Sequence, residues 1–168
     1  MATIRPFKGF RPTPELCSKV AALPYDVMTS KEAREMVKND PYSFLHVDRA
    51  EIDLPENVDI YSKEVYEKAA SNLNKMIEDK VLIQDSKPVY IYSLTMNGRE
   101  QIGLVVCTSI DEYLNNTIKK HEFTRADKEQ DRINHVDYCN ANTGPIFLTY
   151  KNQKTIDQII SKEIEKAP

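Results

Sequence analysis

The chain has 168 residues, of which 40% are hydrophobic and 29% are charged, a composition typical of a globular protein rather than a disordered or fibrous one. Its formal net charge of −3 argues against broad nucleic-acid binding, because that function requires a basic surface. No apolar run approaches the roughly 20 residues that cross a bilayer, and the three widely spaced cysteines do not form a zinc or disulfide pattern. We therefore expect a single domain over residues 1–168, with reduced thiols and a cytoplasmic location.

The amino-terminal part of the chain predicts short elements. Thr13 can serve as the N-cap of a first helix, because a proline follows at the first helical position. Residues 29–32, Thr-Ser-Lys-Glu, fit a capping box that opens a second helix. Residues 43–47, Ser-Phe-Leu-His-Val, indicate a strand, and the polar stretch 48–59 indicates a loop.

The middle of the chain holds the strongest periodic signals. Residues 62–79 place apolar side chains at helical spacing opposite charged ones, which predicts an amphipathic helix. Two β-rich runs flank Asn97-Gly98, a pair that favours a type I′ turn and therefore a hairpin over 89–110. Within it, Leu104 to Cys107 is continuously apolar, which indicates a strand covered on both faces.

The carboxyl-terminal part predicts two more helices and one strand. A helix over 126–139 would bury Ile133, Val136 and Cys139, and a strand would follow at 146–150. Isoleucines then recur at helical spacing, at Ile156, Ile159, Ile160 and Ile164. Together these elements predict an α/β (α+β) fold, a mixed sheet that contains the Asn-Gly hairpin and is flanked by amphipathic helices.

The polar stretch 119–135 is the leading candidate for a site, and it contains two of the three histidines. On a helix, Asp127, Asp131 and His135 share one face, where an aspartate can orient a histidine for proton transfer. Lys128 and Arg132 share the adjacent face and can hold phosphate oxygens. The same spacing also suits an exposed helix supported by alternating charges, so both interpretations stay open.

Other local patterns are weaker. The sequence from His121 begins like a zinc-protease motif but has Arg125 in place of the second histidine, which rules out that chemistry. His121, Glu122 and His135 still allow a looser metal site, and the lysine pair ending at Lys120 adds local positive charge. Asp26 lies in a rigid Pro-Tyr-Asp turn, where it suits either a functional role or a turn cap. Glycine-rich nucleotide loops are missing from the sequence.

Five further blocks of sequence are distinctive when taken together. They are Ile-Arg-Pro-Phe-Lys-Gly at 4–9, Pro-Tyr-Asp-Val at 24–27, Asn-Asp-Pro-Tyr-Ser-Phe-Leu at 39–45, Lys-Lys-His-Glu-Phe-Thr-Arg at 119–125 and Asn-Ala-Asn-Thr-Gly-Pro at 140–145. These blocks resemble the prokaryotic domain-of-unknown-function family 1015, whose members also carry the older label SpoOJ-regulator-like, and the resemblance extends from the start of the chain to about Tyr150. It implies a relationship to the ParB/sulfiredoxin superfamily, which includes free-serine kinases.

The chemistry implied by the resemblance is phosphoryl transfer to a small hydroxyl compound such as free serine, with ATP or ADP and magnesium. It assigns the roles of catalytic base or metal ligand to Glu122, Asp26 or Asp131, without a dedicated metal site. Phosphate binding would fall to Lys120, His121, Arg125, Arg132 and His135. Small-molecule or nucleotide ligands are thus the expected partners.

Members of that family are longer and carry a later Asp-Gly-His-His-Arg-like motif that this sequence does not contain. We therefore expect the chain to be the amino-terminal portion of a longer protein and to be inactive alone. The alternative function is a non-catalytic binding module related to chromosome-partitioning (ParB-like) proteins, with a protein partner. A metal-dependent hydrolase that uses His121, Glu122 and His135 is the third hypothesis.

Overall fold

The computed structural model describes residues 2–86, 89–121 and 123–166. The chain divides into two compact units, each built from separate parts of the sequence. Unit 1 comprises Met1–Lys8, Ser86–Lys120 and Gly144–Pro168, and unit 2 comprises Gly9–Asp85 and His121–Thr143. The single domain expected from the sequence stays a prediction.

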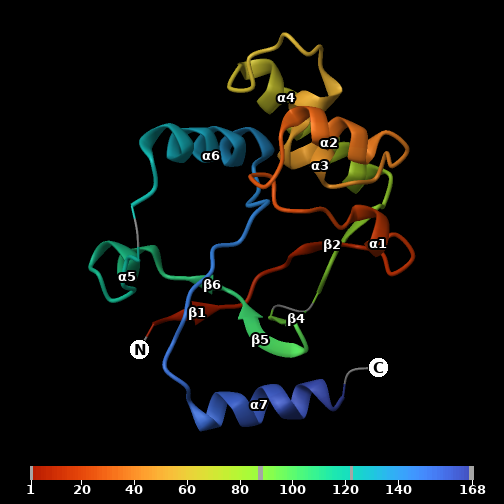
Figure 1. Ribbon diagram of the computed structural model, residues 1–168. Helices are drawn as coiled ribbons and strands as arrows, with labels where there is room; N and C mark the ends of the chain where they lie inside the picture. The colour runs from red at the N-terminus through yellow and green to blue at the C-terminus, as the bar shows by residue number, and fades with distance from the viewer. Residues whose placement is uncertain (1, 87–88, 122, 167–168) are drawn as a thin grey trace. The chain divides into compact units, whose positions relative to one another are not determined.

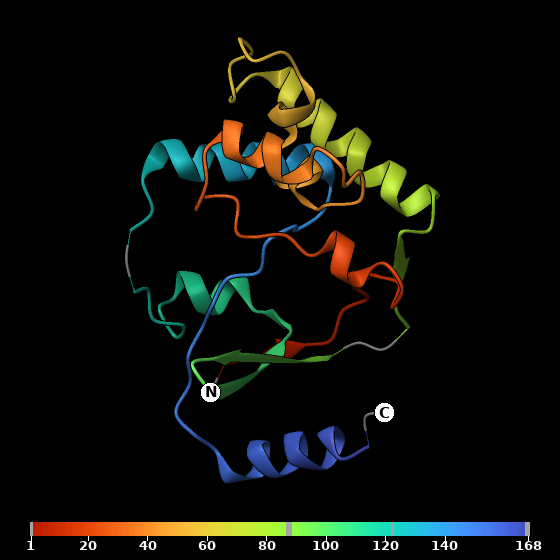
Figure 2. The same ribbon diagram turned by 45° about the vertical axis from the view of Figure 1, so that its right-hand side comes forward.

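The secondary structure is mixed, which confirms the α+β class (Figures 1 and 2). The strands that the structure describes form three antiparallel pairs, β1 with β6, β2 with β3 and β4 with β5. No helix among the described residues is long and apolar enough to cross a membrane.

Unit 2 contains most of the helices and both clusters of buried apolar side chains. Its elements are β2 (Phe10–Pro12), α1 (Cys17–Val20), α2 (Ser30–Val37), α3 (Leu45–Asp48), the 3₁₀ helix η1 (Ala50–Asp53), α4 (Lys63–Glu78), β3 (Leu82–Gln84) and α6 (Ala126–Cys139). The long helix predicted over 62–79 is confirmed as α4, which packs against α3, η1 and α6. Its buried face consists of Val65, Tyr66, Ala69, Leu73 and Met76.

The two helix starts predicted in the amino-terminal part have different outcomes. The capping box of α2 is confirmed, because Glu32 N donates to Thr29 Oγ1 at 3.3 Å and Thr29 N donates to Glu32 Oε2 at 2.7 Å. The cap predicted at Thr13 is wrong, since α1 begins at Cys17. Thr13 instead extends the β2–β3 ladder by donating its amide hydrogen to Val81 O at 3.2 Å.

The strand predicted at 43–47 is also wrong, because these residues lead into the short helix α3. Leu45 and Val47 are both buried, but they pack into different clusters. The predicted loop at 48–59 contains η1, whose Glu51 is buried. Tertiary packing on both sides of this segment outweighs its local β preference.

Helix α6 has the predicted bounds but a different buried face. Cys139 is buried as expected, whereas Ile133 and Val136 are 49% and 37% exposed. His135 takes the inner position, with its Nε2 atom 3.0 Å from Val47 O. A carbonyl oxygen can only accept a hydrogen bond, so Nε2 carries the hydrogen.

Unit 1 contains β1 (Ile4–Arg5), β4 (Tyr90–Met96), β5 (Arg99–Val105), β6 (Cys107–Thr108), α5 (Ile110–Leu114) and α7 (Lys154–Ile164). The hairpin is confirmed: β4 and β5 pair, and both turn residues have positive φ, 53° at Asn97 and 75° at Gly98. The doubly covered strand predicted from Leu104 to Cys107 is wrong, because Cys107 is exposed and the preceding residues are only half-buried.

The strand predicted at 146–150 is wrong as well, because the structure assigns these residues to no strand. Ile146 and Phe147 are 75% and 77% exposed. Their β-branched and aromatic side chains favour an extended backbone, but a strand also requires a hydrogen-bonded neighbour. Helix α7 is confirmed, although among its isoleucines only Ile160 is buried.

Candidate functional site

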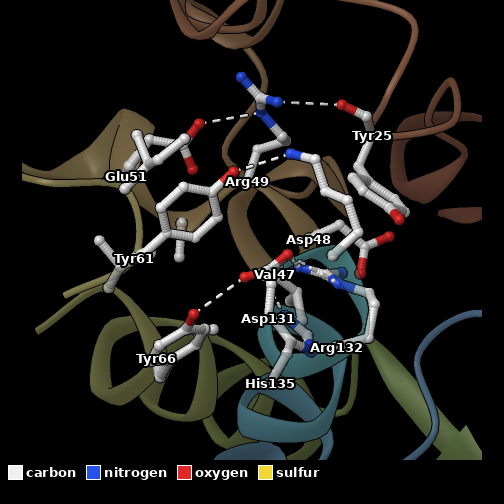
Figure 3. A pocket seen from close by; sticks show the side chains of 15 residues that line it. Tyr25, Val47, Asp48, Arg49, Glu51, Tyr61, Tyr66, Asp131, Arg132 and His135 are labelled. Carbon is white, nitrogen blue, oxygen red and sulfur yellow. Dashed lines mark hydrogen bonds and ion pairs between the residues drawn. The ribbon is translucent and has the colours of Figure 1, made fainter. Parts of the chain in front are cut away.

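A pocket within unit 2 brings together the charged side chains of α6 and of the α3–η1 segment (Figure 3). Its volume is about 60 Å³, whereas one water molecule requires roughly 10–15 Å³ on the same measure. The pocket therefore has room for a small polar molecule. Its walls are Tyr25, Val47, Asp48, Arg49, Ala50, Glu51, Ile60, Tyr61, Val65, Tyr66, Ala69, Lys128, Asp131, Arg132 and His135.

On the α6 side, Asp131 is held by two neighbours. Its Oδ1 atom accepts a hydrogen bond of 2.9 Å from the Tyr66 hydroxyl. Its Oδ2 atom accepts bonds of 3.1 and 2.8 Å from Arg132 Nε and Nη2. Both carboxylate oxygens are thus occupied, which makes Asp131 a structural anchor rather than a free base.

Arg132 connects this anchor to the loop that precedes α2. Its guanidinium carbon lies 4.4 Å from the centre of the Tyr25 ring, a cation–π contact. A guanidinium group has five N–H donors, and the bonds to Asp131 use two of its nitrogens. Arg132 therefore keeps donors for an anionic ligand while Tyr25 and Asp131 fix its orientation.

On the α3–η1 side, Arg49 and Glu51 form an internal ion pair, with 2.9 Å between Arg49 Nε and Glu51 Oε1. Arg49 also donates hydrogen bonds to Tyr25 O at 3.1 Å and to Ser30 Oγ at 2.9 Å. Ser30 donates in turn to Glu51 Oε1 at 2.8 Å. This network ties the Tyr25 loop to η1 and neutralises both charges.

Asp48 differs from the other carboxyl groups of the pocket. Its Oδ1 atom is buried and has no hydrogen-bond partner among the described residues. Burial raises the pKa of Asp48, while the Thr143 side chain, His135 and Arg132 act in the opposite direction. A carboxylate with a raised pKa accepts a proton more readily, which suits a general base.

Lys128 is the cation of the pocket without a carboxylate partner in the part of the chain that the structure describes. Its Nζ atom donates to the Tyr61 hydroxyl at 2.7 Å and lies 5.3 Å from the centre of that ring. The hydrogen bond to Tyr61 raises the pKa of Lys128. The ammonium group therefore stays charged and keeps donors for an anionic ligand.

The structure brings together four of the residues singled out in the sequence. Lys128, Asp131, Arg132 and His135 all line the pocket from one helix, α6. His135 donates to Val47 O rather than to Asp131. The aspartate–histidine pair expected from helical spacing therefore does not form.

The other predicted site residues do not line this pocket. Arg125 is the exposed N-cap residue of α6 and pairs with Asp127 at 2.9 Å. His121 and Asp26 are exposed. Lys120 belongs to unit 1, where its Nζ atom lies 4.7 Å from the centre of the Tyr113 ring. Glu122 lies outside the described residues.

Sequence reasoning did not find the α3–η1 wall. Asp48, Arg49 and Glu51 lie within the stretch 48–59 that the sequence predicts as a polar loop, and Tyr66 lies within the helix predicted over 62–79. For Tyr25 the sequence did offer a signal, because this pocket residue is next to Asp26, which the sequence analysis named as a candidate.

No group of three or more His, Cys, Asp or Glu side chains within the described ranges is arranged to hold a metal ion.

Comparison with known proteins identifies a matching family. The model of a family described as "Protein of unknown function (DUF1015)" matches residues 4–168. Neither the curated proteins nor the solved structures contain a match to the chain. Because the family match covers nearly the whole sequence, it confirms the resemblance based on the five sequence blocks. The chain belongs to the DUF1015 family of proteins of unknown function.

Proposed function

We propose that the pocket of unit 2 binds a small hydroxyl compound such as free serine, as the acceptor side of a kinase-like enzyme in a longer cytoplasmic protein. The observation that carries this proposal is a pair of opposite charges in one pocket, neither of which forms a salt bridge among the described residues. Asp48, whose Oδ1 atom is buried without a hydrogen-bond partner among these residues, and Lys128 line the same pocket. A ligand that carries both a hydrogen-bond donor and an anionic group complements them.

Different residues of the pocket would bind different groups of the ligand. Asp48 accepts the hydrogen bond of the ligand's hydroxyl group and, with its raised pKa, can take up that proton. Lys128 and Arg132 hold anionic oxygens, the arginine through its planar fork of donors. Tyr61 and Tyr25 position these two cations.

ATP or ADP with magnesium, the donor implied by the resemblance, does not fit inside this pocket. A volume of about 60 Å³ accommodates only a few water-sized groups, and a nucleotide is several times larger. A nucleotide would need a surface outside the pocket, so the proposal assigns it no contact here.

Replacing Lys128 with methionine is expected to weaken the binding of serine and O-phosphoserine about tenfold or more, because methionine removes the positive charge and the donors that would hold the anionic group of the ligand. Isothermal titration calorimetry of the wild type and the variant measures the change. The matched control is Lys19→Met, since Lys19 is also an exposed lysine of unit 2 that lies over a tyrosine ring, 5.9 Å from the centre of Tyr42. Equal affinities of the two variants, or a wild type that binds neither compound, would contradict the proposal.

A further inference from the structure

His46 lies on α3, outside the pocket but two residues before Asp48, and both of its ring nitrogens have close partners. Nδ1 is 2.8 Å from Asp53 Oδ1, and Nε2 is 3.1 Å from Asp40 O. The first partner belongs to η1 and the second to the turn after α2. His46 thus connects three successive segments of unit 2.

Both partners of the ring can only accept hydrogen bonds. Asp40 contributes a carbonyl oxygen. Asp53 contributes a carboxylate: burial raises its pKa, but the hydrogen bonds from His46 and Asn72 and the charge of Lys68 outweigh this effect and lower it. Each ring nitrogen must therefore donate, which only the imidazolium form of histidine can do.

We propose that His46 is a pH-dependent clasp, which as an imidazolium holds α3 and η1 against the turn after α2 and on losing a proton releases this link. The remaining hydrogen stays on Nδ1, because the bond to the Asp53 carboxylate is charge-assisted. The lone pair of Nε2 then faces the lone pairs of Asp40 O. The contact that opens is the one to Asp40.

The clasp is connected to the pocket through the backbone of α3 and η1. Asn72 of α4 donates to His46 O at 2.6 Å and to Asp53 Oδ2 at 2.8 Å, so the imidazole belongs to a network that fixes both ends of this segment. Asp48, Arg49 and Glu51 lie between those two ends and line the pocket. Release of the clasp therefore loosens the pocket wall that carries Asp48. Ligand binding should weaken as a result, and this consequence rests on the proposed function.

The direction of the pH effect follows from the hydrogen bonds. The bond to Asp53 raises the pKa of His46, and partial burial opposes it. The stabilisation is thus complete below the usual histidine pKa of about 6.5 and is lost as the pH rises through the higher pKa of the folded protein. The charged groups that act on this network are Asp53 from η1, Asp40 from the turn after α2 and Lys68 from α4.

Long-range ¹H–¹⁵N NMR of the ligand-free protein tests the clasp directly. At pH 6 both ring nitrogens of His46 are expected to carry hydrogen, and as the pH rises Nε2 is expected to lose it while Nδ1 keeps it. A ring with only one protonated nitrogen at pH 6 would overturn the proposal. This measurement uses only the wild type, so it does not depend on the folding of a variant.

Amide hydrogen exchange of the same ligand-free protein tests the release. Corrected for intrinsic rates, protection of the amides in 45–53 should fall about tenfold or more from pH 6 to pH 9, as expected for the loss of a hydrogen bond to a charged group. His46→Gln should remove this pH dependence, whereas His121→Gln, a change at an exposed histidine of the same unit, should preserve it. Equal pH dependence in all three proteins would overturn the clasp.

Serine titrations of the wild type at pH 6 and pH 9 test the consequence for the pocket, where weaker binding at pH 9 is expected. Equal affinity at both values would overturn the regulatory role. The NMR and exchange results contain no ligand, so a failure of serine binding would refute the proposed function and leave the clasp standing.

Discussion

Replacing Leu45 with alanine is expected to lower the free energy of unfolding by about 2–5 kcal/mol, the range for truncating a buried leucine. The Leu45 side chain is 1% exposed. It packs with Ala33, Val37 and Ile52, so one side chain joins α2, α3 and η1. Truncation removes apolar contacts and leaves a cavity in a cluster that has few other large members.

Urea unfolding of the wild type and Leu45→Ala, followed by circular dichroism, measures this loss. Leu23→Ala is the matched control, because Leu23 belongs to the same unit but is 54% exposed; its change should stay within about 0.5 kcal/mol. If both variants lose the same small amount, the second core cluster is not packed as described.

Replacing His135 with leucine is expected to lower the free energy of unfolding of unit 2 by about 1–3 kcal/mol, although leucine is also a large side chain. His135 is 3% exposed, and its Nε2–H group is a hydrogen-bond donor to Val47 O. Leucine cannot donate, so the carbonyl oxygen would remain buried without this bond, which costs about that amount. His135→Gln should recover part of the loss, because its side-chain amide can donate from a similar position.

Thermal and urea unfolding of these variants separate a structural role for His135 from the phosphate-binding role implied by the family resemblance. His121→Leu serves as the control, since His121 is exposed, and it should leave stability nearly unchanged. A fully stable His135→Leu protein would show that the bond to Val47 contributes little and would reopen a ligand role for this histidine.

Local sequence patterns identified the elements whose signals are complete within one segment. The bounds of α6, the capping box of Thr29 and Glu32 and the Asn97-Gly98 turn are all confirmed. In each case neighbouring residues along the chain supply the deciding hydrogen bonds or backbone conformation. Periodicity over four turns likewise identified α4, which needs no distant information.

The segment around α3 was not predictable in the same way. Leu45 and Val47 are two residues apart with a polar residue between them, which on a strand would place them on one face. On α3 they point into two different clusters, because packed elements cover the segment on more than one side. Only the tertiary arrangement reveals that both positions are buried in a helical turn.

The site also combines features that local sequence predicts with features that depend on the tertiary structure. Asp131, Arg132 and His135 lie on one helix, so their spacing placed them together correctly. The orientation of that helix was not available from the spacing, because His135 faces inward to a carbonyl group contributed by a distant segment. Asp48 and Tyr66 complete the pocket from other elements, and no local pattern connects them to α6.

NMR chemical-shift mapping during a titration with serine tests most directly whether the pocket of unit 2 is a ligand site. The account predicts the largest shifts at the amides of Asp48, Arg49, Lys128 and Arg132. The apolar groove lined by Leu23, Met36 and Leu45 in the same unit should show little change. Shifts centred on that groove or within unit 1, or no shifts at any serine concentration, would contradict the assignment.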